Sequence, residues 1–403
     1  MRAGRVVVVG ESIAGCAATL ALRRAGVEGV TVYERAQGRL ADRGVGVAMH
    51  NARYAELESA GYLDAHIPWG RIVHRRWYVR DNAMPNAPLG REIATNPFPF
   101  RSYNWGSLWH ELRRRMPETA VFRSGSAVEA VELTPEGAEV HSGGRTEHYD
   151  VVIGADGYRS TVRAALYPDV RPQYAGYLAW RGAYPADRLR DAELWAEDEC
   201  AYVVFQGGHL VVYRIPDGTG GHRVNWILYT APPAGLDQGM HTPTSLPPGT
   251  AGDALRAHLT YLAAELLPAY WGDLVRATTH DELFLQPMYD FTAPRYAVGR
   301  ALLMGDAATV ARPHTGAGAV KALQDATILE SALMSAATWS EALVAYDADR
   351  APSGRVMVDL GRRLGRALVQ ETPNWPTLDQ PGLETWWDQA AGTGAFGGRE
   401  LKR

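Results

Sequence analysis

Short apolar runs and one amphipathic stretch alternate at the start of the chain. Residues 6–9 form a β-branched run that ends at a glycine, which predicts a buried parallel strand. Residues 13–25 predict a helix that stops at Gly26. Residues 30–34 predict a second strand. Together these elements predict a β-α-β unit with a right-handed crossover.

Two further runs of the same kind lie far downstream, at residues 151–154 and 301–304. They predict that one parallel sheet is assembled from separated segments of the chain. Between them, residues 174–229 alternate in character and contain turns rich in glycine and proline, which predicts an antiparallel sheet with hairpins. The fold class is therefore α/β, with an antiparallel sheet inserted into a discontinuous domain.

Helical periodicity dominates the C-terminal part. We expect one helix from Gly316 to about residue 335, a second over residues 340–350, and a third from Pro352 to residue 370. The last thirty or so residues are rich in proline and glycine and show little periodicity. They predict either a loose tail or a packing arm.

Composition narrows the function classes. The 403 residues suffice for two or three domains, and 46% hydrophobic with 21% charged residues is typical of a soluble globular protein. A net charge of -4 predicts no attraction to nucleic acid or to acidic membrane surfaces. We find no apolar run of the length of a membrane span, and we expect no metal site. Two cysteines, Cys16 and Cys200, are too few for a disulfide framework, so we predict a cytoplasmic protein.

The turn VVVVGESIAG nearly matches a dinucleotide-binding fingerprint. Gly10 permits the tight turn, Gly15 lets the helix pack on the strand, and Ser12 replaces the middle glycine with a small hydroxyl that can bond a phosphate. Glu34 ends the second strand, where an acid is expected for the ribose. The predicted cofactor contacts in this turn are Gly10, Ser12, Ile13, Ala14 and Gly15. The alternative is a glycine-rich turn that only closes the sheet, and this turn alone does not distinguish NAD from FAD.

Two downstream segments add to this motif. DVVIGADGYRSTVR places Asp156 just after a strand, and LLMGDAATVARPHTGAGAVKAL places Asp306 after another strand, ahead of a glycine-containing helix start. The three segments in this order resemble the FAD-dependent aromatic hydroxylases of the para-hydroxybenzoate hydroxylase type, which are single-component flavoprotein monooxygenases. The resemblance extends to about Gln370. The WRG sequence at Trp180 and the RPHTGAG sequence look most similar to the dihydroxypyridine hydroxylase-like subgroup.

The resemblance implies roles for individual residues. Glu34 is similar to the ribose ligand, Arg35 to an arginine beside the adenine, and Asp156 to an acid near the pyrophosphate and the passing nicotinamide. Asp306 is similar to the acid that binds the ribityl chain or the pyrophosphate. Further implied cofactor contacts are Arg43, Val47, Gly305, Pro313, Gly316, Ala317 and Gly318. Where the family usually has an arginine, YNWGSLWHEL has Trp105, so Arg43 is expected to carry more of the phosphate charge.

The resemblance also implies the domain organisation. We expect a Rossmann-like FAD-binding domain of the glutathione-reductase type from residues 1–72, 99–172 and 279–370. The antiparallel-sheet substrate domain is expected from residues 73–98 and 173–278, and the C-terminal tail from 371–403.

The implied chemistry is hydroxylation of a small, hydroxylated aromatic or heteroaromatic substrate. NAD(P)H would reduce the FAD as a transient co-substrate, and dioxygen would form a flavin hydroperoxide that the electron-rich ring attacks. Three alternatives stay open: a related reductase or halogenase, although the halogenase motif Trp-x-Trp-x-Ile-Pro is missing from the sequence; a catalytically inactive flavin-binding pathway partner; and an NAD-dependent dehydrogenase without flavin. The sequence leaves the oligomeric state open, with a homodimer as one option.

Candidate catalytic residues come from several segments. They are His50, His209, Tyr213, His314 and Arg181. The alternating region also offers Tyr202, Phe205, Trp226 and Tyr229 to a substrate pocket. Aromatic residues at alternate positions of a sheet also occur as core, and His209, beside a glycine pair, can be a solvated turn residue. Arg181 can neutralise a phenolate or carboxylate, or form a salt bridge with Asp187 or Asp191.

Overall fold

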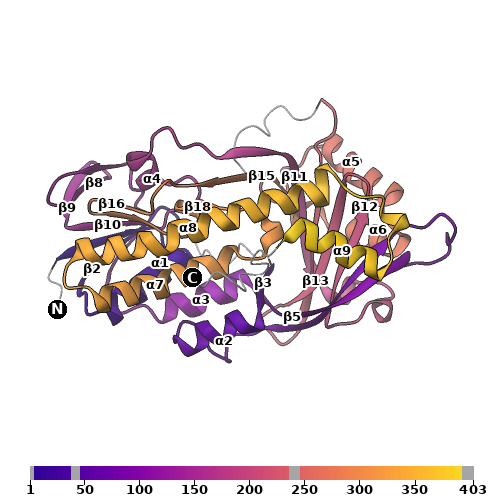
Figure 1. Ribbon diagram of the computed structural model, residues 1–403, viewed down its shortest axis with the longest axis horizontal. Helices are drawn as coiled ribbons and strands as arrows, with labels where there is room; N and C mark the ends of the chain where they lie inside the picture. The colour runs from indigo at the N-terminus through magenta and orange to yellow at the C-terminus, as the bar shows by residue number, and fades with distance from the viewer. Residues whose placement is uncertain (1–3, 38–45, 236–245, 393–403) are drawn as a thin grey trace.

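The computed structural model describes residues 4–37, 46–235 and 246–392 of the chain (Figure 1). A six-stranded sheet occupies one end of the molecule, in the order β16-β17-β10-β1-β2-β6. Its strands are β1 (Arg5–Val9), β2 (Gly29–Glu34), β6 (Val121–Ser124), β10 (Val151–Gly154), β16 (Ala297–Val298) and β17 (Ala301–Leu303). Strand β1 pairs in parallel with both β2 and β10, and β10 pairs in parallel with β17. The predicted assembly of one parallel sheet from distant segments is thus confirmed.

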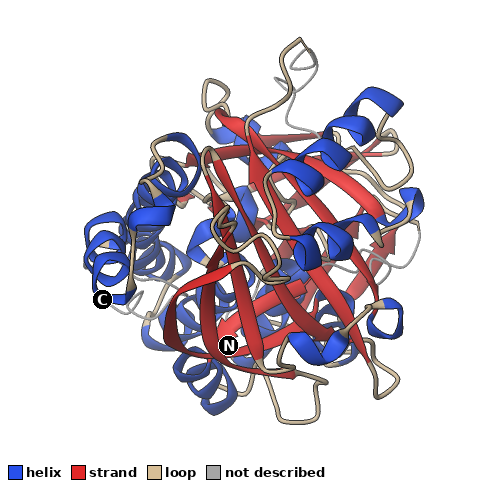
Figure 2. Ribbon diagram, turned by 90° about the vertical axis from the view of Figure 1, so that its right-hand side faces the viewer, coloured by secondary structure: helices blue, strands red, loops and turns tan. Residues whose placement is uncertain are grey.

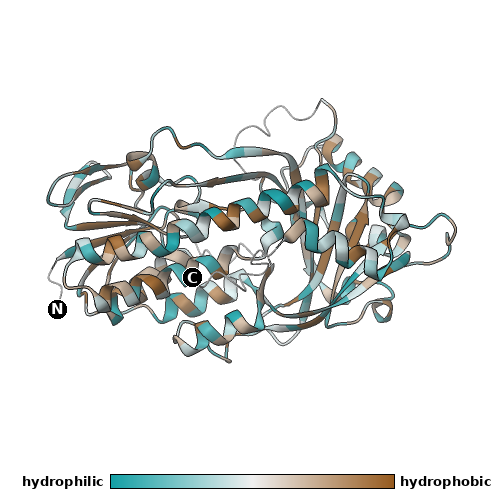
Figure 3. Ribbon diagram, in the orientation of Figure 1, coloured by the Kyte–Doolittle hydropathy of each residue, from teal (hydrophilic) through white to brown (hydrophobic). Residues whose placement is uncertain are grey.

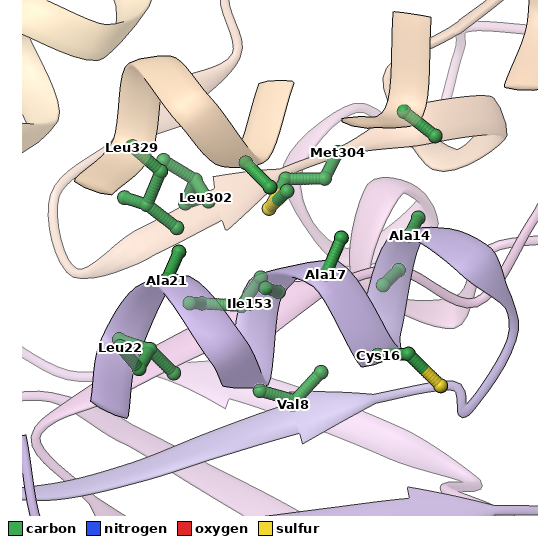
Figure 4. Packing of buried hydrophobic residues seen from close by; sticks show 14 of the residues in the cluster. Val8, Ala14, Cys16, Ala17, Ala21, Leu22, Ile153, Leu302, Met304 and Leu329 are labelled. Carbon is green, nitrogen blue, oxygen red and sulfur yellow. The ribbon is translucent and has the colours of Figure 1, made fainter. Parts of the chain in front are cut away.

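Helix α1 (Ile13–Arg24) packs on this sheet almost without exposed surface on its inner side. Figure 4 shows Ala17 and Ala21 pointing toward the element that carries Leu329, while the opposite side of the helix lies over Val8. Small side chains let two neighbouring layers approach α1 closely. This packing fixes the N-terminal end of α1 at the carboxyl ends of the parallel strands, where ligands bind in α/β sheets.

A nine-stranded sheet forms the other half, in the order β18-β15-β11-β14-β13-β12-β4-β5-β3. Its strands are β3 (Gly46–His50), β4 (Gly70–Val79), β5 (Arg91–Asn104), β11 (Gln173–Pro185), β12 (Glu199–Phe205), β13 (Gly208–Pro216), β14 (His222–Thr230), β15 (Leu283–Thr292) and β18 (Thr309–Val310). The predicted antiparallel hairpins are confirmed, since β13 pairs antiparallel with both β12 and β14. Strands β3 and β15 join this sheet from segments assigned to the cofactor domain, and the proposed domain bounds stay a prediction.

Both faces of the large sheet are covered. Helices α5 (Asp253–Glu265) and α6 (Ala269–Arg276) lie over one face, where Trp180 and Trp226 are fully buried (Figure 2). The other face carries Tyr177, among other aromatic residues, and packs toward the C-terminal helices. Strands β12 and β13 are buried along their whole length, so their residues alternate between two buried environments rather than between a buried and a solvent-exposed one.

The C-terminal helices differ from the sequence prediction at one point. Helix α7 (Gly318–Ser335) is followed by a single long helix α8 (Trp339–Gly365) that contains Pro352, and a π-helical turn (Arg366–Gln370) continues it. The predicted break before Pro352 is wrong. A proline removes one backbone hydrogen bond and need not end a helix whose neighbouring residues are buried. In Figure 3, α7 and α8 carry both hydrophobic and hydrophilic residues along their length.

The described part of the C-terminal segment is a packing arm, so the loose-tail alternative is wrong for residues 371–392. Helix α9 (Gln380–Ala391) brings Trp386 and Trp387 against the large sheet. Trp375 is buried and meets Trp386 edge to face with ring centroids 4.8 Å apart. This arm packs on the same face of the sheet as Tyr202 and Tyr229, which line the site described below.

Smaller elements complete the fold. They are α2 (Asn51–Ser59), α3 (Trp105–Arg114), α4 (Thr161–Leu166) and a three-stranded sheet of β7 (Ala130–Leu133), β8 (Ala138–Ser142) and β9 (Arg145–Tyr149). Within residues 4–37, 46–235 and 246–392, no helix combines the length and the apolar character needed to cross a membrane.

Candidate active site

A cavity of about 560 Å³ is bordered by residues from both sheets. Its walls include the start of α1, strand β3, the start of α7 and alternate residues of the large sheet. Sequence-predicted residues that line it are Ser12, Ile13, Ala14, Val47, Arg181, His209, Tyr213, Asp306, Pro313, His314, Gly316, Ala317 and Gly318. The structure therefore brings together residues separated by more than three hundred positions.

The glycine turn between β1 and α1 depends on its two glycines. Gly10 has a φ of +102, and a Cβ there would lie 2.4 Å from the carbonyl oxygen of Ala155. A Cβ on Gly15 would lie 1.8 Å from the carbonyl oxygen of Gly10. Ser12 makes no side-chain capping bond to α1, so its hydroxyl remains available at the cavity wall. The free backbone N–H groups that begin α1 can bind an anion at this position.

Glu34 organises the same turn from the end of β2. One carboxylate oxygen accepts the N–H of Glu11 at 2.9 Å, and the other accepts the N–H of Ala36 at 2.8 Å. A carboxylate can accept about four hydrogen bonds, so both oxygens retain capacity for a ligand hydroxyl. Arg35 follows on the exposed surface.

A partly buried ion pair beneath the turn was not predicted from the sequence. Glu11 is 5% exposed and pairs with Arg113 of α3, while the Trp109 indole donates to the carbonyl oxygen of Glu11 at 2.7 Å. Burial raises the pKa of Glu11, and Arg113 opposes that rise. No local sequence pattern predicts this ion pair, because its two partners lie on different elements.

The carboxylate of Asp156 is bonded to its own loop and to the start of α4. It accepts the Ser160 hydroxyl at 2.5 Å and the N–H of Thr161 at 2.7 Å, and so supports the start of α4, whose N-cap is Ser160. The residues on either side, Ala155 and Gly157, line the cavity. At this motif the backbone borders the cavity, and the carboxylate holds the backbone in place.

Asp306 lies on the opposite wall. Its side chain is exposed to the cavity, yet the surrounding protein raises the pKa of the carboxyl, and Lys321 opposes the rise. Its preceding residue, Gly305, is fixed by Asp325, which accepts the Gly305 N–H at 2.8 Å. Asp325 also pairs with Lys321 at 2.5 Å and with Arg350 at 2.7 Å. This buried ion network, another feature that sequence patterns missed, anchors the Asp306 loop.

The loop ahead of α7 ends in a helix N-terminus that faces the cavity. Gly316 adopts a φ of +61, a conformation that favours glycine, and Ala317 offers no side-chain cap. The first N–H groups of α7 are therefore available to a ligand, and the helix directs its positive end toward the cavity. A negatively charged group is stabilised at such a position.

Two histidines and a tyrosine form an aromatic cluster at the sheet end of the cavity. The ring of His314 lies 4.5 Å from Tyr229 and 5.3 Å from His209, measured between centroids. Burial lowers the pKa of His209 to about 3 and holds the pKa of His314 well below 6.5, so both imidazoles are neutral. His209 is 1% exposed, which contradicts its interpretation as a solvated turn residue.

Arg181 lines the cavity near Tyr229. It lowers the pKa of Tyr229 against the larger effect of burial. Its Nε is buried and has no hydrogen-bond partner among the described residues. The expected alternative of a salt bridge to Asp187 or Asp191 is wrong, because the described part of the chain contains no such pair. The Nε of Arg181 therefore remains available to an anionic or polar ligand group.

Three sequence predictions for this pocket require correction. His50 is not among the residues that line the cavity, and its Nδ1 instead accepts the N–H of Ala52 as the cap of α2. Phe205 and Trp226 lie in the core under α5 and α6, because the strand register directs them to the opposite face of the sheet. Arg43 lies outside the described residues.

A separate group of side chains that could hold a metal ion lies on the small sheet, and none of its members is among the residues that line the cavity. Glu132, Glu139 and His141 place ligand atoms within 4.8 Å of one another, and Glu132 is exposed. The expectation of no metal site stays a prediction.

Comparison with known proteins places this geometry in context. A model described as "FAD binding domain" matches residues 260–360, and one described as "FAD binding domain-like" matches residues 174–290. The chain is 31% identical to the 2,6-dihydroxypyridine 3-monooxygenase of Paenarthrobacter nicotinovorans, over 81% of each chain. It is 29% identical to the 3-amino-4-hydroxybenzoate 2-monooxygenase of Streptomyces cremeus, covering 93% of this chain and 91% of the relative.

Solved structures agree with these relatives. The 2,6-dihydroxypyridine-3-hydroxylase of Arthrobacter nicotinovorans superposes with a TM-score of 0.82 at 25% identity, covering 94% of this chain and 97% of that one. HpxO of Klebsiella pneumoniae, solved with FAD and uric acid, has a TM-score of 0.76 at 20% identity, covering 97% and 93%. The second likeness concerns the fold alone.

Proposed function

This chain belongs to the family of FAD-dependent aromatic monooxygenases, and we propose that it hydroxylates a small, hydroxylated aromatic or heteroaromatic ring with NAD(P)H and dioxygen. The relatives that support this substrate class are named for a dihydroxypyridine and for an aminohydroxybenzoate. Family membership is inconsistent with the alternative of an NAD-dependent dehydrogenase without flavin. A cytoplasmic location and a homodimer remain proposals.

The single observation that carries this proposal is the composition of the cavity. One wall combines a glycine turn, a free helix N-terminus and the carboxylate of Asp306, and the facing wall carries neutral imidazoles and tyrosines. The first wall suits phosphates and a polyol chain. The second suits a small planar ring.

The residues of the first wall fit FAD. Ser12 and the start of α1 would hold the pyrophosphate, because Gly10 and Gly15 leave no room for side chains there. Glu34 would accept a ribose hydroxyl, and Asp306 would accept hydroxyls of the ribityl chain. When bound, FAD supplies hydride uptake from NAD(P)H and the activation of dioxygen.

The chain's own residues would then orient and activate the ring. Tyr229 and His314 provide aromatic faces, and the α9 arm with the helices over the sheet keeps bulk water from this end of the cavity. His209, with its pKa near 3, can accept a hydrogen bond from a ring hydroxyl without becoming protonated. Such a bond leaves electron density on the ring, which favours attack by an electrophilic oxygen.

Purified protein reconstituted with FAD tests the proposal. We expect bound flavin, and an increase in NAD(P)H oxidation when a hydroxylated pyridine or phenol is added, with a hydroxylated product by mass spectrometry. Retention of flavin without any stimulation across such a panel would instead favour the catalytically inactive flavin-binding alternative.

A further inference from the structure

The tautomer of His209 is fixed by the backbone. Its Nδ1 lies 3.3 Å from the carbonyl oxygen of Leu368, in the π-helical turn that follows α8. A carbonyl oxygen only accepts hydrogen bonds, so Nδ1 carries the proton. The other ring nitrogen, Nε2, is then an acceptor with an open lone pair.

The tautomer of His314 is fixed in the opposite sense. Its Nε2 lies 2.7 Å from the hydroxyl oxygen of Tyr177. The guanidinium of Arg312 lies near the same hydroxyl. Both groups lie against Gly365, since a Cβ added there would be 2.4 Å from the tyrosine oxygen and 2.9 Å from Arg312 Nη1. The described residues offer the buried Tyr177 O–H no other acceptor, so we assign the O–H as donated to His314 Nε2. The remaining nitrogen, His314 Nδ1, therefore carries a proton and is a donor.

Arg312 is itself held firmly in place. Its Nε donates to Asp290 at 2.8 Å, and Asp290 also accepts from Arg362 Nε at 2.9 Å. This chain of contacts begins at a buried carboxylate and ends at the cavity wall, so the orientation of the Tyr177 hydroxyl is constrained. Tyr177 is in this sense a positioning residue for His314.

The two imidazoles are adjacent and both line the cavity, with ring centroids 5.3 Å apart. Within the described residues, neither His209 Nε2 nor His314 Nδ1 has a hydrogen-bond partner. Burial keeps both rings neutral. One wall of the cavity thus presents an acceptor and a donor side by side, and each is fixed by a separate neighbour.

We propose that His209 and His314 form a fixed acceptor–donor pair that selects substrates carrying a hydrogen-bond donor beside an acceptor on one edge of the ring. The lactam form of a hydroxylated azine has such an edge. The inference rests on the proposed function, because it assumes that the substrate ring occupies this end of the cavity. A ring edge that offers only acceptors leaves the lone pair of His209 Nε2 unsatisfied, which a buried site penalises strongly.

The experiment measures dissociation constants on the FAD-loaded protein from the change in flavin absorbance. The probes are 2-pyridone, which offers N–H and C=O together, N-methyl-2-pyridone, which lacks the donor, and benzoate, which offers only charged acceptors. We expect wild-type protein to bind 2-pyridone about tenfold or more tightly than either other probe. His209→Phe should reduce the preference between the two pyridones to about threefold or less, with FAD content unchanged.

Tyr177→Phe tests the positioning role. Without the tyrosine hydroxyl, His314 can adopt either tautomer, so the preference for 2-pyridone should fall while FAD content stays the same. Tyr184→Phe is the matched control, because Tyr184 lies on the same strand with its hydroxyl bonded at 3.0 Å to the carbonyl oxygen of Leu274, in the core under α6. This control should retain the wild-type preference.

Several outcomes would overturn the proposal: equal binding of the two pyridones by wild-type protein, no measurable binding of any probe, a preference unchanged in both His209→Phe and Tyr177→Phe, or tighter binding of benzoate. The last result would indicate that Arg181 selects an anion instead. These titrations require no turnover, so they remain informative even when NAD(P)H oxidation is not stimulated, which is the result that counts against the proposed function.

Discussion

The two ends of the cavity are built from different parts of the polypeptide. At the cofactor end, the backbone forms the surface: Gly10 and Gly15 exclude side chains, and the starts of α1 and α7 provide N–H groups. At the sheet end, side chains form the surface, with residues such as His209 and Tyr229 projecting from neighbouring strands. A backbone surface tolerates no added atoms, whereas a side-chain surface can change its ligand through single substitutions. The first end suits an invariant cofactor and the second a variable substrate.

The largest effect is expected at the backbone surface. Gly15→Val places a side chain where even a Cβ would lie 1.8 Å from a carbonyl oxygen, so the turn must move. We expect purified protein to retain almost no FAD, as measured by flavin absorbance per protein. Gly252→Ala, at a position with nothing within 4 Å of the added Cβ, is the control and should retain FAD. Normal flavin content in Gly15→Val would contradict the assignment of this turn.

Ser12 separates the effect of bulk from the effect of the hydroxyl. Ser12→Leu fills the cavity wall at the start of α1 and should abolish FAD binding, because the phosphates can no longer approach the helix N-terminus. Ser12→Gly should bind FAD nearly as well as wild type. Isothermal titration of the apoprotein with FAD measures both, and equal loss in the two variants would show that the hydroxyl itself is essential.

Asp306 is expected to have an intermediate effect. Asp306→Ala removes a carboxylate that faces the cavity, and a hydrogen bond to a charged group contributes about 1.5–3 kcal/mol, so FAD should bind roughly tenfold to a hundredfold more weakly. Asp187→Ala, at an exposed carboxylate outside the cavity, is the control. An unchanged dissociation constant for Asp306→Ala would remove this residue from the cofactor site.

Per pH unit, the smallest expected effect is the change in stability that comes from His209 at the sheet end. The pKa of His209 is lowered from 6.5 to about 3 in the folded protein. Between these values the unfolded chain binds a proton that the folded chain does not, so this residue makes the free energy of unfolding fall as pH decreases. The slope contribution is at most ~1.4 kcal/mol per pH unit. Urea titrations at several pH values across this window should show a shallower dependence for His209→Phe, and an identical slope would contradict the burial of a neutral imidazole.

The same contrast explains what sequence patterns could predict. Gly10 and Glu34 could be predicted because a strand, a turn and a helix start are contiguous in sequence, whereas the role of Asp306 was implied by the family resemblance. The partly buried pair of Glu11 with Arg113 escaped prediction, since it joins elements that only the fold brings together.

At the sheet end, alternation indicated a sheet but left open which face meets the cavity. His209 and Tyr229 face it, whereas Phe205 and Trp226 face the opposite core. A shift of one residue in register exchanges these sets, and sequence alone does not determine the register. His50 was misassigned for a related reason: a histidine after a strand can cap the next helix.

The central claim is that this cavity joins an FAD site to an aromatic substrate pocket in one working enzyme. The most direct test supplies the FAD-loaded protein with NAD(P)H, isotopically labelled dioxygen and a panel of hydroxylated pyridines and phenols. We predict that at least one ring compound accelerates NAD(P)H oxidation and yields a hydroxylated product that carries one labelled oxygen atom. Flavin-loaded protein that consumes NAD(P)H at the same rate with every ring compound, and forms no labelled product, would contradict the claim.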